Sequence, residues 1–406
     1  MAEISCISPI DGAVVAVRQA MDAAAATATI KAARATQTAW AARPLDERIA
    51  LVNAGVKALG AANDEIVPEL ARMMGRPVRY GGEFGGVEER ASHMASIAAA
   101  TLADIEVGED ASFRRFIRRL PHGVVFVVAP WNYPYLTAIN TIAPALIAGN
   151  AVVLKHATQT LLAGDRLAAA FHSAGLPGQL FVNICLDHET TAALIADGLF
   201  DFINFTGSVG GGRAMERAAA GTFTGVGTEL GGKDPGYVMD DADLDAAVAT
   251  LVDAAMFNSG QCCCGIERIY VHESLYDDFV ARAVATVNDY RLGNPLDSDT
   301  TMGPMAHVRF AAHVRHQIDE AVAAGAVAHI ARMAADDDGA YLTPQVLTNV
   351  THAMDVMREV VRVLRPGGQL ILSQSNRCFY TKAVGVWTRD MSDAAHLRVL
   401  GTYIHF

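Results

Sequence analysis

The sequence predicts a large α/β protein built on a parallel β-sheet and followed by a second α/β unit. Short apolar runs alternate with segments of helical periodicity from residue 122 to about residue 230, an alternation typical of βαβ units. The run Val124–Val128 is apolar throughout, as expected for a strand covered on both faces. At 406 residues, the chain is long enough for two or three domains with separate cores.

The elements can be placed in order from these patterns. Residues 1 to about 115 are expected to be mostly helical, because Ala and Val recur at helical spacing over Ala13–Ala42 and Ile49–Leu59. The sheet unit is expected to contain strands at Val124–Val128, Ala151–Leu154, Leu180–Ile184, Phe202–Phe205 and Thr224–Glu229, and helices at Thr137–Ile147, Leu161–Ser173, Thr190–Ala196 and Ala214–Ala220. The second unit is expected to contain helices at Leu244–Phe257, Tyr276–Tyr290 and Phe310–Ala324, and strands at Ile266–Val271, Val327–Ile330 and Leu342–Leu347.

The composition argues against several classes of protein. A net charge of −12 disfavours a general binder of nucleic acid or of anionic membranes. The cysteines form no C-x-x-C pair, so neither a metal site nor a dense disulfide framework is indicated. They are Cys6, Cys185, Cys262, Cys263, Cys264 and Cys378. Free thiols fit a reducing cytosol and no signal peptide is evident, so we expect a cytoplasmic protein.

One long uncharged stretch could be mistaken for a membrane span. Leu120 to Leu154 contains no Asp, Glu, Lys or Arg, and a span needs about 20 apolar residues. Pro130, Pro134, Pro144 and the Gly149-Asn150 pair interrupt this stretch. We therefore expect a strand, a helix and a second strand in a buried core.

Three consecutive cysteines are the strongest chemical signal in the chain. They follow a Gly-Gln turn and the apolar segment Leu244–Phe257, in the sequence Asn258-Ser259-Gly260-Gln261-Cys262-Cys263-Cys264-Gly265. A thiolate is a good nucleophile where its surroundings lower the pKa of the thiol, and Cys263 is the candidate nucleophile. The alternative is that these thiols pack as small hydrophobic side chains.

Two other segments carry groups suited to carbonyl chemistry. The sequence Pro130-Trp131-Asn132-Tyr133-Pro134 follows a buried strand. Its prolines fix the loop, so that the Asn132 amide could hold an oxyanion; an ordinary structural turn is the alternative. Glu229, in Glu229-Leu230-Gly231-Gly232-Lys233, could act as a general base toward water, or it could be a solvated carboxylate.

A glycine-rich turn and a lysine indicate a phosphate or ribose site. Phe205-Thr206-Gly207-Ser208-Val209-Gly210-Gly211-Gly212 links a strand to a helix, and such a turn can cradle phosphate at the helix N-terminus. It does not match G-x-G-x-x-G, so a purely structural turn is the alternative. Lys155 ends a strand and could reach a ribose hydroxyl or a phosphate, or it could be a solvated surface charge.

Together these motifs resemble those of the aldehyde dehydrogenase superfamily. The shared marks are the Pro-Trp-Asn-aromatic-Pro loop, the Phe-Thr-Gly-Ser turn, the Glu-Leu-Gly-Gly-Lys segment and the Gly-Gln-x-Cys nucleophile, in the family's order over roughly residues 8 to 358. The resemblance implies a Rossmann-like dinucleotide-binding domain with N-terminal helices over residues 1–230. It further implies a catalytic α/β domain over residues 231–358, which the motif pattern leaves truncated.

The resemblance also assigns roles to the candidate residues. It implies that Cys263 attacks a small aldehyde, that Asn132 and the Cys263 backbone N–H hold the oxyanion, and that hydride transfer leaves a thioester. Glu229 then activates the water that hydrolyses it. Family members that pass the acyl group to coenzyme A generally lack this glutamate, so its presence favours a carboxylic acid product.

The cofactor implied by the resemblance is NAD or NADP. Lys155 is expected at the adenosine ribose, Gly207 and Ser208 near the pyrophosphate, and Trp131 and Leu230 along the nicotinamide path. Members that select NAD often carry Glu three residues after this lysine, whereas this chain has Thr158. Without that carboxylate a 2′-phosphate is not repelled, so NADP is expected beside NAD.

The sequence departs from the family pattern after residue 358. The family continues as Glu-x-Phe-Gly-Pro, but this chain reads Glu359-Val360-Val361, so the expected Glu and Phe contacts to the nicotinamide ribose are missing. The tail, residues 359–406, contains Val-Leu-Arg-Pro-Gly-Gly before an apolar run and resembles the late part of a class I methyltransferase. We therefore expect a fusion of two genes or reading frames; a divergent family C-terminus is the alternative.

Three functions follow from these observations. The first is NAD(P)-dependent oxidation of an aldehyde to a carboxylic acid. The second is an inactive fragment that still binds dinucleotide, and the third is a methyltransferase, which only the tail favours. Family members usually form homo-oligomers, but the segment they use is not recognisable in this sequence.

Overall fold

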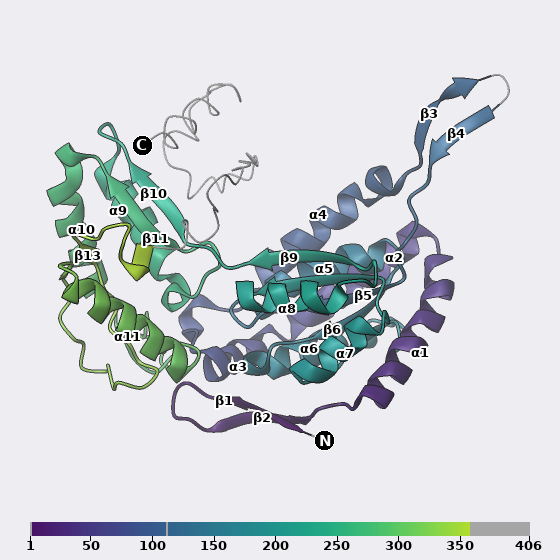
Figure 1. The fold of residues 1–406 in the computed structure, drawn as a ribbon, viewed down its shortest axis with the longest axis horizontal. Helices are drawn as coiled ribbons and strands as arrows, with labels where there is room; N and C mark the ends of the chain where they lie inside the picture. Colours follow the sequence, from purple (N-terminus) through teal and green to yellow (C-terminus); the bar gives the residue numbers. More distant parts are fainter. Residues whose placement is uncertain (1, 111–112, 358–406) are drawn as a thin grey trace. The chain divides into compact units, whose positions relative to one another are not determined.

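The computed structural model describes residues 2–110 and 113–357 (Figure 1). The described residues group into two compact units. The first comprises the described residues up to Gly231 together with Arg291–Ala311 and Asp337–Tyr341, and the second comprises Gly232–Tyr290, Ala312–Asp336 and Leu342–Met357. The division at residues 230 and 358 that the sequence suggested stays a prediction.

A five-stranded parallel sheet forms the centre of the first unit. Its strands are β5 (Val124–Val128), β6 (Ala151–Lys155), β7 (Phe181–Asn183), β8 (Phe202–Gly207) and β9 (Gly225–Leu230), in the order β7-β6-β5-β8-β9. Every neighbouring pair is parallel. The order reverses beside β5, because β6 and β7 lie on one side of it and β8 and β9 on the other. Open α/β sheets bind ligands at such a switch point, outside the carboxyl ends of the strands.

Helices cover both faces of this sheet (Figure 1). On one face lie α5 (Pro134–Ile147) and α6 (Leu161–Ser173), backed by α2 (Leu45–Ala61) and α4 (Phe84–Leu102). On the other face lie α1 (Ala23–Ala41), α7 (His188–Ala196) and α8 (Val209–Ala219). This is the doubly wound α/β arrangement that the alternating pattern predicted, and the predicted fold class is confirmed.

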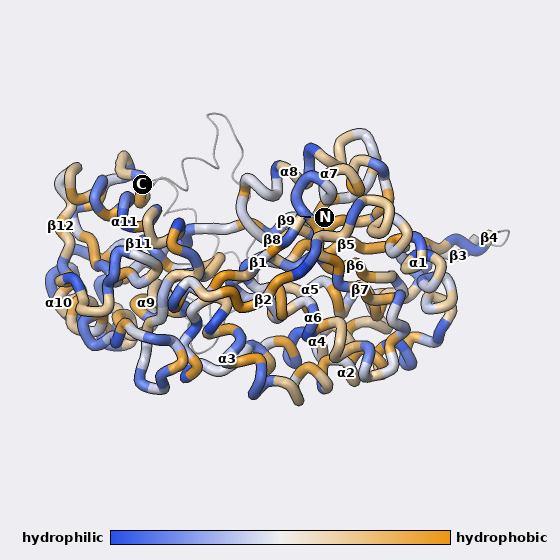
Figure 2. Tube along the Cα trace, turned by 90° about the horizontal axis from the view of Figure 1, so that it is seen from below, coloured by the Kyte–Doolittle hydropathy of each residue, from blue (hydrophilic) through white to orange (hydrophobic). Residues whose placement is uncertain are grey.

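The core of the first unit is built on its central strands. All ten positions of β5 and β6 are buried, and Figure 2 colours these strands as predominantly hydrophobic. Phe126 on β5 stacks on Phe200 with ring centroids 4.2 Å apart. The uncharged stretch Leu120–Leu154 forms β5, α5 and β6, as predicted. In the part of the chain that the structure describes, no helix is both long and apolar enough to cross a bilayer.

The first 115 residues are less helical than predicted. β1 (Glu3–Ile7) and β2 (Val14–Gln19) form an antiparallel hairpin, and α1 begins only at Ala23, where the Asp22 side chain accepts a hydrogen bond from Ala25 N at 2.8 Å. The predicted helix over Ala13–Ala42 is therefore wrong at its start. The sequence Val-Val-Ala-Val is a short apolar run rich in β-branched residues, which favour a strand, and the alanines after it hid this signal.

A second hairpin was also missed. β3 (Ile105–Asp110) and β4 (Phe113–Ile117) pair antiparallel and project from the rest of the first unit (Figures 1 and 2). In sequence, the segment between the two hairpins also contains α3 (Asn63–Met74) and the short helix η1 (Val78–Tyr80), beside α1, α2 and α4. Further one-turn helices are η2 (Thr158–Thr160), η3 (Phe257–Gly260), η4 (Glu273–Leu275) and η5 (Asp355–Met357).

The second unit is a smaller α/β structure. β10 (Asp234–Val238) runs parallel to β11 (Ile266–Val271), and α9 (Leu244–Met256) and α10 (Tyr276–Asn288) pack on them. β10 was not predicted. The helix α11 (Val308–Ala323) crosses the boundary between the two units.

The predicted strand at Leu342–Leu347 is mostly wrong. Only β13 (Leu347–Thr348) pairs, with β12 (Val327–Ala328). In the preceding residues, side chains replace the ladder: Thr343 Oγ1 accepts from Met333 N at 2.9 Å, and Gln345 Oε1 accepts from Ile330 N at 3.1 Å. Side-chain bonds of this kind compete with regular pairing.

The packing of α2 against α6 gives a test of the fold. A Cβ on Gly55 would lie 2.6 Å from Cδ1 of the buried Phe171 ring, so Gly55→Ala is expected to lower the free energy of unfolding by about 1–3 kcal/mol. The matched control is Gly85→Ala in α4, where no atom lies within 4 Å of the added Cβ; it is expected to raise stability by up to about 1 kcal/mol. Urea unfolding curves measure both, and equal effects at the two positions would contradict the packing described.

Candidate active site

The carboxyl ends of the parallel strands, together with the loops that follow them, carry most of the predicted site residues. Trp131 and Asn132 follow β5; Lys155 ends β6 and Thr158 lies in the next turn; Gly207 ends β8 and Ser208 follows it; Glu229 and Leu230 end β9. The sheet therefore brings eight of the nine predicted residues to its carboxyl edge in the first unit. The ninth, Cys263, belongs to the second unit.

The Asn132 loop is held by its own backbone and by a distant arginine. Asn132 Oδ1 accepts a hydrogen bond from Tyr133 N at 3.1 Å, and the Asn132 carbonyl oxygen accepts one from Arg76 Nη2 at 2.6 Å. Because the amide oxygen is used as an acceptor within the turn, the amide nitrogen, which can only donate, is given a fixed direction. Beside it, Trp131 stacks on Phe310 of the same unit with ring centroids 5.2 Å apart.

The glycine turn after β8 has clear packing reasons for its glycines. A Cβ on Gly207 or on Gly211 would lie 2.8 or 2.4 Å from the Phe205 ring. Ser208 caps α8, because its Oγ accepts from Gly211 N at 3.2 Å. The structural alternative for this turn is thus supported, and the same geometry presents the N-terminus of α8, to which phosphate groups bind in many α/β proteins.

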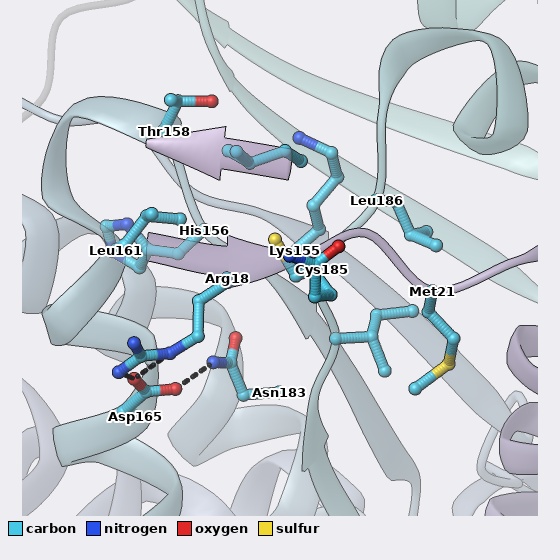
Figure 3. Close-up of a pocket in the computed structure, with 13 residues that line it drawn as sticks. Arg18, Met21, Lys155, His156, Thr158, Leu161, Asp165, Asn183, Cys185 and Leu186 are labelled. Atoms are coloured by element: carbon cyan, nitrogen blue, oxygen red, sulfur yellow. Dashed lines mark hydrogen bonds and ion pairs between the residues drawn. The ribbon is translucent and has the colours of Figure 1, made fainter. Parts of the chain in front are cut away.

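Lys155 lies in the wall of a cavity of about 210 Å³ (Figure 3). The residue is only 7% exposed, so the alternative of a solvated surface charge is wrong. Burial lowers the pKa of Lys155, and the nearby Cys185 and Asp187 oppose that shift. Thr158 also lines the cavity and is exposed. A desolvated ammonium group gains from a ligand that brings oxygen acceptors.

The other side of this cavity is built by residues that the sequence did not reveal. Arg18 of β2 donates through Nε and Nη2 to Asp165 Oδ2, at 3.1 and 2.5 Å, and Asn183 Nδ2 donates to Asp165 Oδ1 at 2.9 Å. The dashed lines in Figure 3 mark these contacts. Arg18 and Asp165 are 147 positions apart, and only the fold connects them.

Glu229 is exposed at the end of the edge strand β9, where water can reach its carboxylate. The next residue, Leu230, is half-buried and packs on Gly212, since a Cβ there would lie 2.9 Å from a Leu230 methyl carbon. The two neighbours thus differ: Leu230 anchors the strand end against α8, whereas Glu229 faces solvent.

The three cysteines follow a backbone of unusual conformation. After α9 the chain turns through Asn258, Ser259 and Gly260, with φ of 56°, 56° and 73°. Left-handed backbone at a residue such as Ser259 is uncommon and costs free energy. Such strain often occurs next to functional groups.

The three thiols have different surroundings. Cys262 Sγ donates to the Phe257 carbonyl oxygen at 3.5 Å, whereas Cys263 and Cys264 are exposed. The hydrogen bond between the Cys263 and Cys264 thiols raises the pKa of Cys263, and desolvation of the sulfur raises it further. The raised pKa favours the protonated form of the Cys263 thiol, whose proton has to leave when the sulfur reacts. Cys263 is accessible, so the alternative of a buried hydrophobic side chain is wrong for it.

Arg76 and Glu83 were missed by the sequence analysis. Arg76 Nη1 donates to Glu83 Oε1 at 2.7 Å, and the two side chains are 4% and 3% exposed. The available signal was an arginine between Gly75 and Pro77, followed by a glutamate directly after a Gly-Gly pair. Nothing in the local pattern said that either charge is buried.

No group of three or more His, Cys, Asp or Glu is arranged to hold a metal ion among residues 2–110 and 113–357.

The sequence profile of the aldehyde dehydrogenase family matches residues 1–399. The chain belongs to the aldehyde dehydrogenase family. It is similar to 3,6-anhydro-alpha-L-galactose dehydrogenase of Streptomyces coelicolor, with 33% identity over 96% of this chain and 82% of the relative. It is also similar to succinate-semialdehyde dehydrogenase [NADP(+)] 1 of Mycobacterium tuberculosis, with 32% identity over 96% of this chain and 87% of the relative.

Solved structures of aldehyde dehydrogenases have the same fold. A 3,6-anhydro-L-galactose dehydrogenase in complex with NAP matches 88% of this chain and 76% of its own with a TM-score of 0.83 and 29% identity. PnpE in complex with nicotinamide adenine dinucleotide matches 85% of this chain and 72% of its own with a TM-score of 0.79 and 29% identity.

The family match corrects the prediction for the C-terminal tail. It runs to residue 399, through most of residues 359–406, so the resemblance to a methyltransferase and the gene fusion inferred from it are not supported. The tail and the missing Glu and Phe contacts lie outside the described residues. The prediction of an aldehyde dehydrogenase is confirmed at the level of the family, whereas the roles of individual residues stay predictions.

The contact between the two exposed thiols gives a test of the surroundings of Cys263. Because the hydrogen bond from Cys264 raises the pKa of Cys263, Cys264→Ala is expected to lower that pKa and to speed alkylation of Cys263 by iodoacetamide at pH 8. Each unit of pKa is worth up to about tenfold in thiolate concentration. Mass spectrometry of the peptide that carries Cys263, followed from pH 7 to pH 10, measures the rate.

The matched control for this test is Cys262→Ala, which removes a neighbouring thiol that has a smaller effect on Cys263. It is expected to change the alkylation rate less than Cys264→Ala does. Equal rates in the wild type and both variants would contradict the electrostatic account.

Proposed function

We propose that the protein oxidises an aldehyde to a carboxylic acid with NAD or NADP, through a thioester on Cys263. The observation that carries the proposal is the gathering of Asn132, Lys155, Ser208 and Glu229 at the carboxyl edge of one parallel sheet. This edge is where doubly wound sheets bind their ligands. Family membership supports the same chemistry.

The sulfur begins the reaction. Cys263 gives its proton to solvent, and the thiolate bonds to the aldehyde carbon while the carbonyl π bond breaks, so that the oxygen becomes an oxyanion. The Asn132 amide and the Cys263 backbone N–H donate hydrogen bonds to it. A nicotinamide cofactor, if bound at this edge, would supply the acceptor for the hydride that leaves the thiohemiacetal carbon. Loss of the hydride leaves the acyl group bound to Cys263 as a thioester. Glu229 then takes a proton from the water that attacks this thioester, and the hydrolysis releases the acid and restores the thiol.

The short chain separation between Glu229 and Gly232 supports the proposal that Glu229 acts together with Cys263. Within the second unit, a Cβ on Gly232 would lie 3.0 Å from the Cys263 carbonyl oxygen. Glu229 precedes Gly232 by three residues, a stretch that spans at most about 11 Å. This short separation along the chain is compatible with the proposed role of Glu229 as the base for the water that attacks the Cys263 thioester.

The cavity at Lys155 supports the cofactor assignment. Lys155 can donate to the adenosine ribose, and Thr158 lines the same cavity. The N-terminus of α8, capped by Ser208, suits the pyrophosphate because its backbone N–H groups favour anions. Trp131 and Leu230 then lie along the path toward the nicotinamide.

The relatives support both forms of the cofactor and no single substrate. Succinate-semialdehyde dehydrogenase [NADP(+)] 1 is named for NADP, and PnpE was solved with nicotinamide adenine dinucleotide. Two relatives are named for an anhydrosugar and for succinate semialdehyde, so the proposal is limited to a small aldehyde. A cytoplasmic location and a homo-oligomeric state stay predictions.

Substitution of the nucleophile and of the base tests the proposed order of events. Cys263→Ala is expected to reduce aldehyde-dependent formation of NADH or NADPH to background, and Cys264→Ala, the matched control, to retain it. Glu229→Gln is expected to slow the steady state by about 10²–10⁴-fold after a burst of up to one reduced cofactor per active site. Absorbance of the reduced cofactor and the intact mass of the acyl-enzyme measure these effects.

The nucleophile assignment fails if Cys263→Ala turns over normally. If cofactor binds but the wild type forms no reduced cofactor with any small aldehyde tested, the proposed oxidation itself is refuted.

Thr158 gives a test of cofactor selectivity. Thr158→Glu adds a carboxylate where the 2′-phosphate of NADP is expected, and like charges repel. The ratio of kcat/KM with NADP to that with NAD is therefore expected to fall by at least about tenfold, since close like-charge contacts cost several kcal/mol. Thr38→Glu on α1, which adds the same charge at an exposed site, is the control and should leave the ratio unchanged. An unchanged ratio in Thr158→Glu would remove this residue from the cofactor site.

A further inference from the structure

A buried ion pair in the first unit lies next to the loop that carries Asn132. Arg76 directly follows Gly75, at the end of α3, and Glu83 directly precedes α4. Their side chains pair at 2.7 Å and are almost completely excluded from water. Burying two charges is costly unless hydrogen bonds satisfy their remaining atoms, so the other contacts of the pair show what it holds in position.

Arg76 holds the peptide that follows Asn132. While Nη1 donates to Glu83, Nη2 donates to the Asn132 carbonyl oxygen at 2.6 Å. The guanidinium carbon also lies 4.9 Å from the centre of the Tyr133 ring. A guanidinium offers donors in a rigid plane, which the single ammonium group of lysine does not. Arg76 thereby fixes the Asn132 peptide relative to the Glu83 carboxylate.

Glu83 holds the other end of the same loop. Its Oε2 accepts from Tyr135 N at 3.0 Å and from Leu136 N at 2.7 Å. Both N–H groups belong to the first turn of α5, where backbone donors have no partner within the helix. A carboxylate there is also favoured by the helix dipole. The pair therefore joins the Asn132 peptide to the start of α5.

The backbone before Arg76 is itself fixed. Gly75 has φ of 82°, and a Cβ on it would lie 2.3 Å from the Pro304 carbonyl oxygen. On the facing segment of the same polypeptide, a Cβ on Gly303 would lie 1.9 Å from the Gly75 carbonyl oxygen. Two glycines thus allow two backbones of the first unit to touch at the residue before Arg76, which limits the movement of the arginine at its base.

We propose that Arg76, held by Glu83, is a positioning residue that sets the Asn132 amide for oxyanion binding. The inference rests on the proposed function, in which Asn132 donates to the oxyanion. Since Asn132 Oδ1 accepts from Tyr133 N, the direction of its amide follows the peptide that Arg76 holds. A displacement of about 1 Å in such a group can cost about 100-fold in rate.

The kinetic test uses Arg76→Lys, which keeps a positive charge opposite Glu83 but cannot serve both oxygens in one plane. It is expected to lower kcat by about 10–100-fold, because an oxyanion donor is displaced without being removed, with the KM for the aldehyde and the Kd for the cofactor little changed. Arg166→Lys is the matched control. Arg166 donates to Glu69 at 2.6 Å in the same unit, and its substitution should leave kcat unchanged. An equal loss of kcat in both variants would mean a general structural role and overturn the proposal.

A double substitution separates positioning from stability. If Arg76 acts through Asn132, then Asn132→Ala costs much less in the Arg76→Lys background than in the wild type, because the donor is already misplaced. Independent effects, which multiply in kcat, would overturn the proposal. Thermal unfolding of the same four proteins shows whether losses of stability run parallel to the losses of kcat.

Amide hydrogen exchange gives a readout that does not need turnover. Arg76→Lys is expected to speed exchange in the peptide of residues 129–136, and Arg166→Lys to leave it unchanged. A wild type without Cys263-dependent turnover refutes the proposed function and with it the catalytic purpose of the pair. Unchanged exchange in Arg76→Lys, by contrast, refutes the hold of Arg76 on the loop in a protein that does turn over.

Discussion

The constraint on which this structure depends is the common direction of five strands. In a parallel sheet all carboxyl ends lie at one edge, so each crossover returns the chain to the same side before the next loop begins. The carboxyl ends of four strands, or the loops directly after them, carry Asn132, Lys155, Ser208 and Glu229. These residues span almost a hundred positions of sequence, yet none needs a special contact with another to reach this edge. The buried hydrogen-bond ladder of the sheet aligns them.

The strands and loops that form this edge could largely be predicted, because the sequence patterns that identify them are local. A continuously apolar run such as Val124–Val128 identifies a strand in a two-sided sheet, and a Pro-Trp-Asn or Gly-Ser segment directly after a strand identifies the loop that matters. The helix Leu161–Ser173 was predicted with its observed bounds. Errors arose where an alanine-rich segment hid the short β-branched run of β2, and where side-chain hydrogen bonds replaced a strand, near Thr343.

Other parts of the candidate site could not be predicted, since they depend on contacts across long sequence separations. Whether Lys155 is solvated or buried is decided by the hairpin β1–β2 and by Arg18, which pairs with Asp165. The burial of Arg76 and Glu83 depends on how four segments of the first unit pack together: the end of α3, the start of α4, the Asn132 loop with the start of α5, and Gly303-Pro304. The degree of desolvation decides whether a charged group is a surface feature or part of the site. Sequence alone gives no value for it. Cys263 shows the converse: the motif was clear, but its raised pKa arises from a neighbouring thiol.

The first unit is discontinuous in sequence, and this has a consequence for its folding. The Tyr80 hydroxyl donates to the Thr301 carbonyl oxygen at 2.8 Å, although 221 positions separate the two residues, and Gly75 packs on Pro304. On the ribosome, these contacts cannot form until synthesis has passed Pro304, long after the strands of the sheet have emerged. In a nascent chain, the segment that packs beside Arg76 is therefore still missing. Contacts between residues so far apart in sequence form slowly. Completion of this region should be among the last events in maturation of the polypeptide.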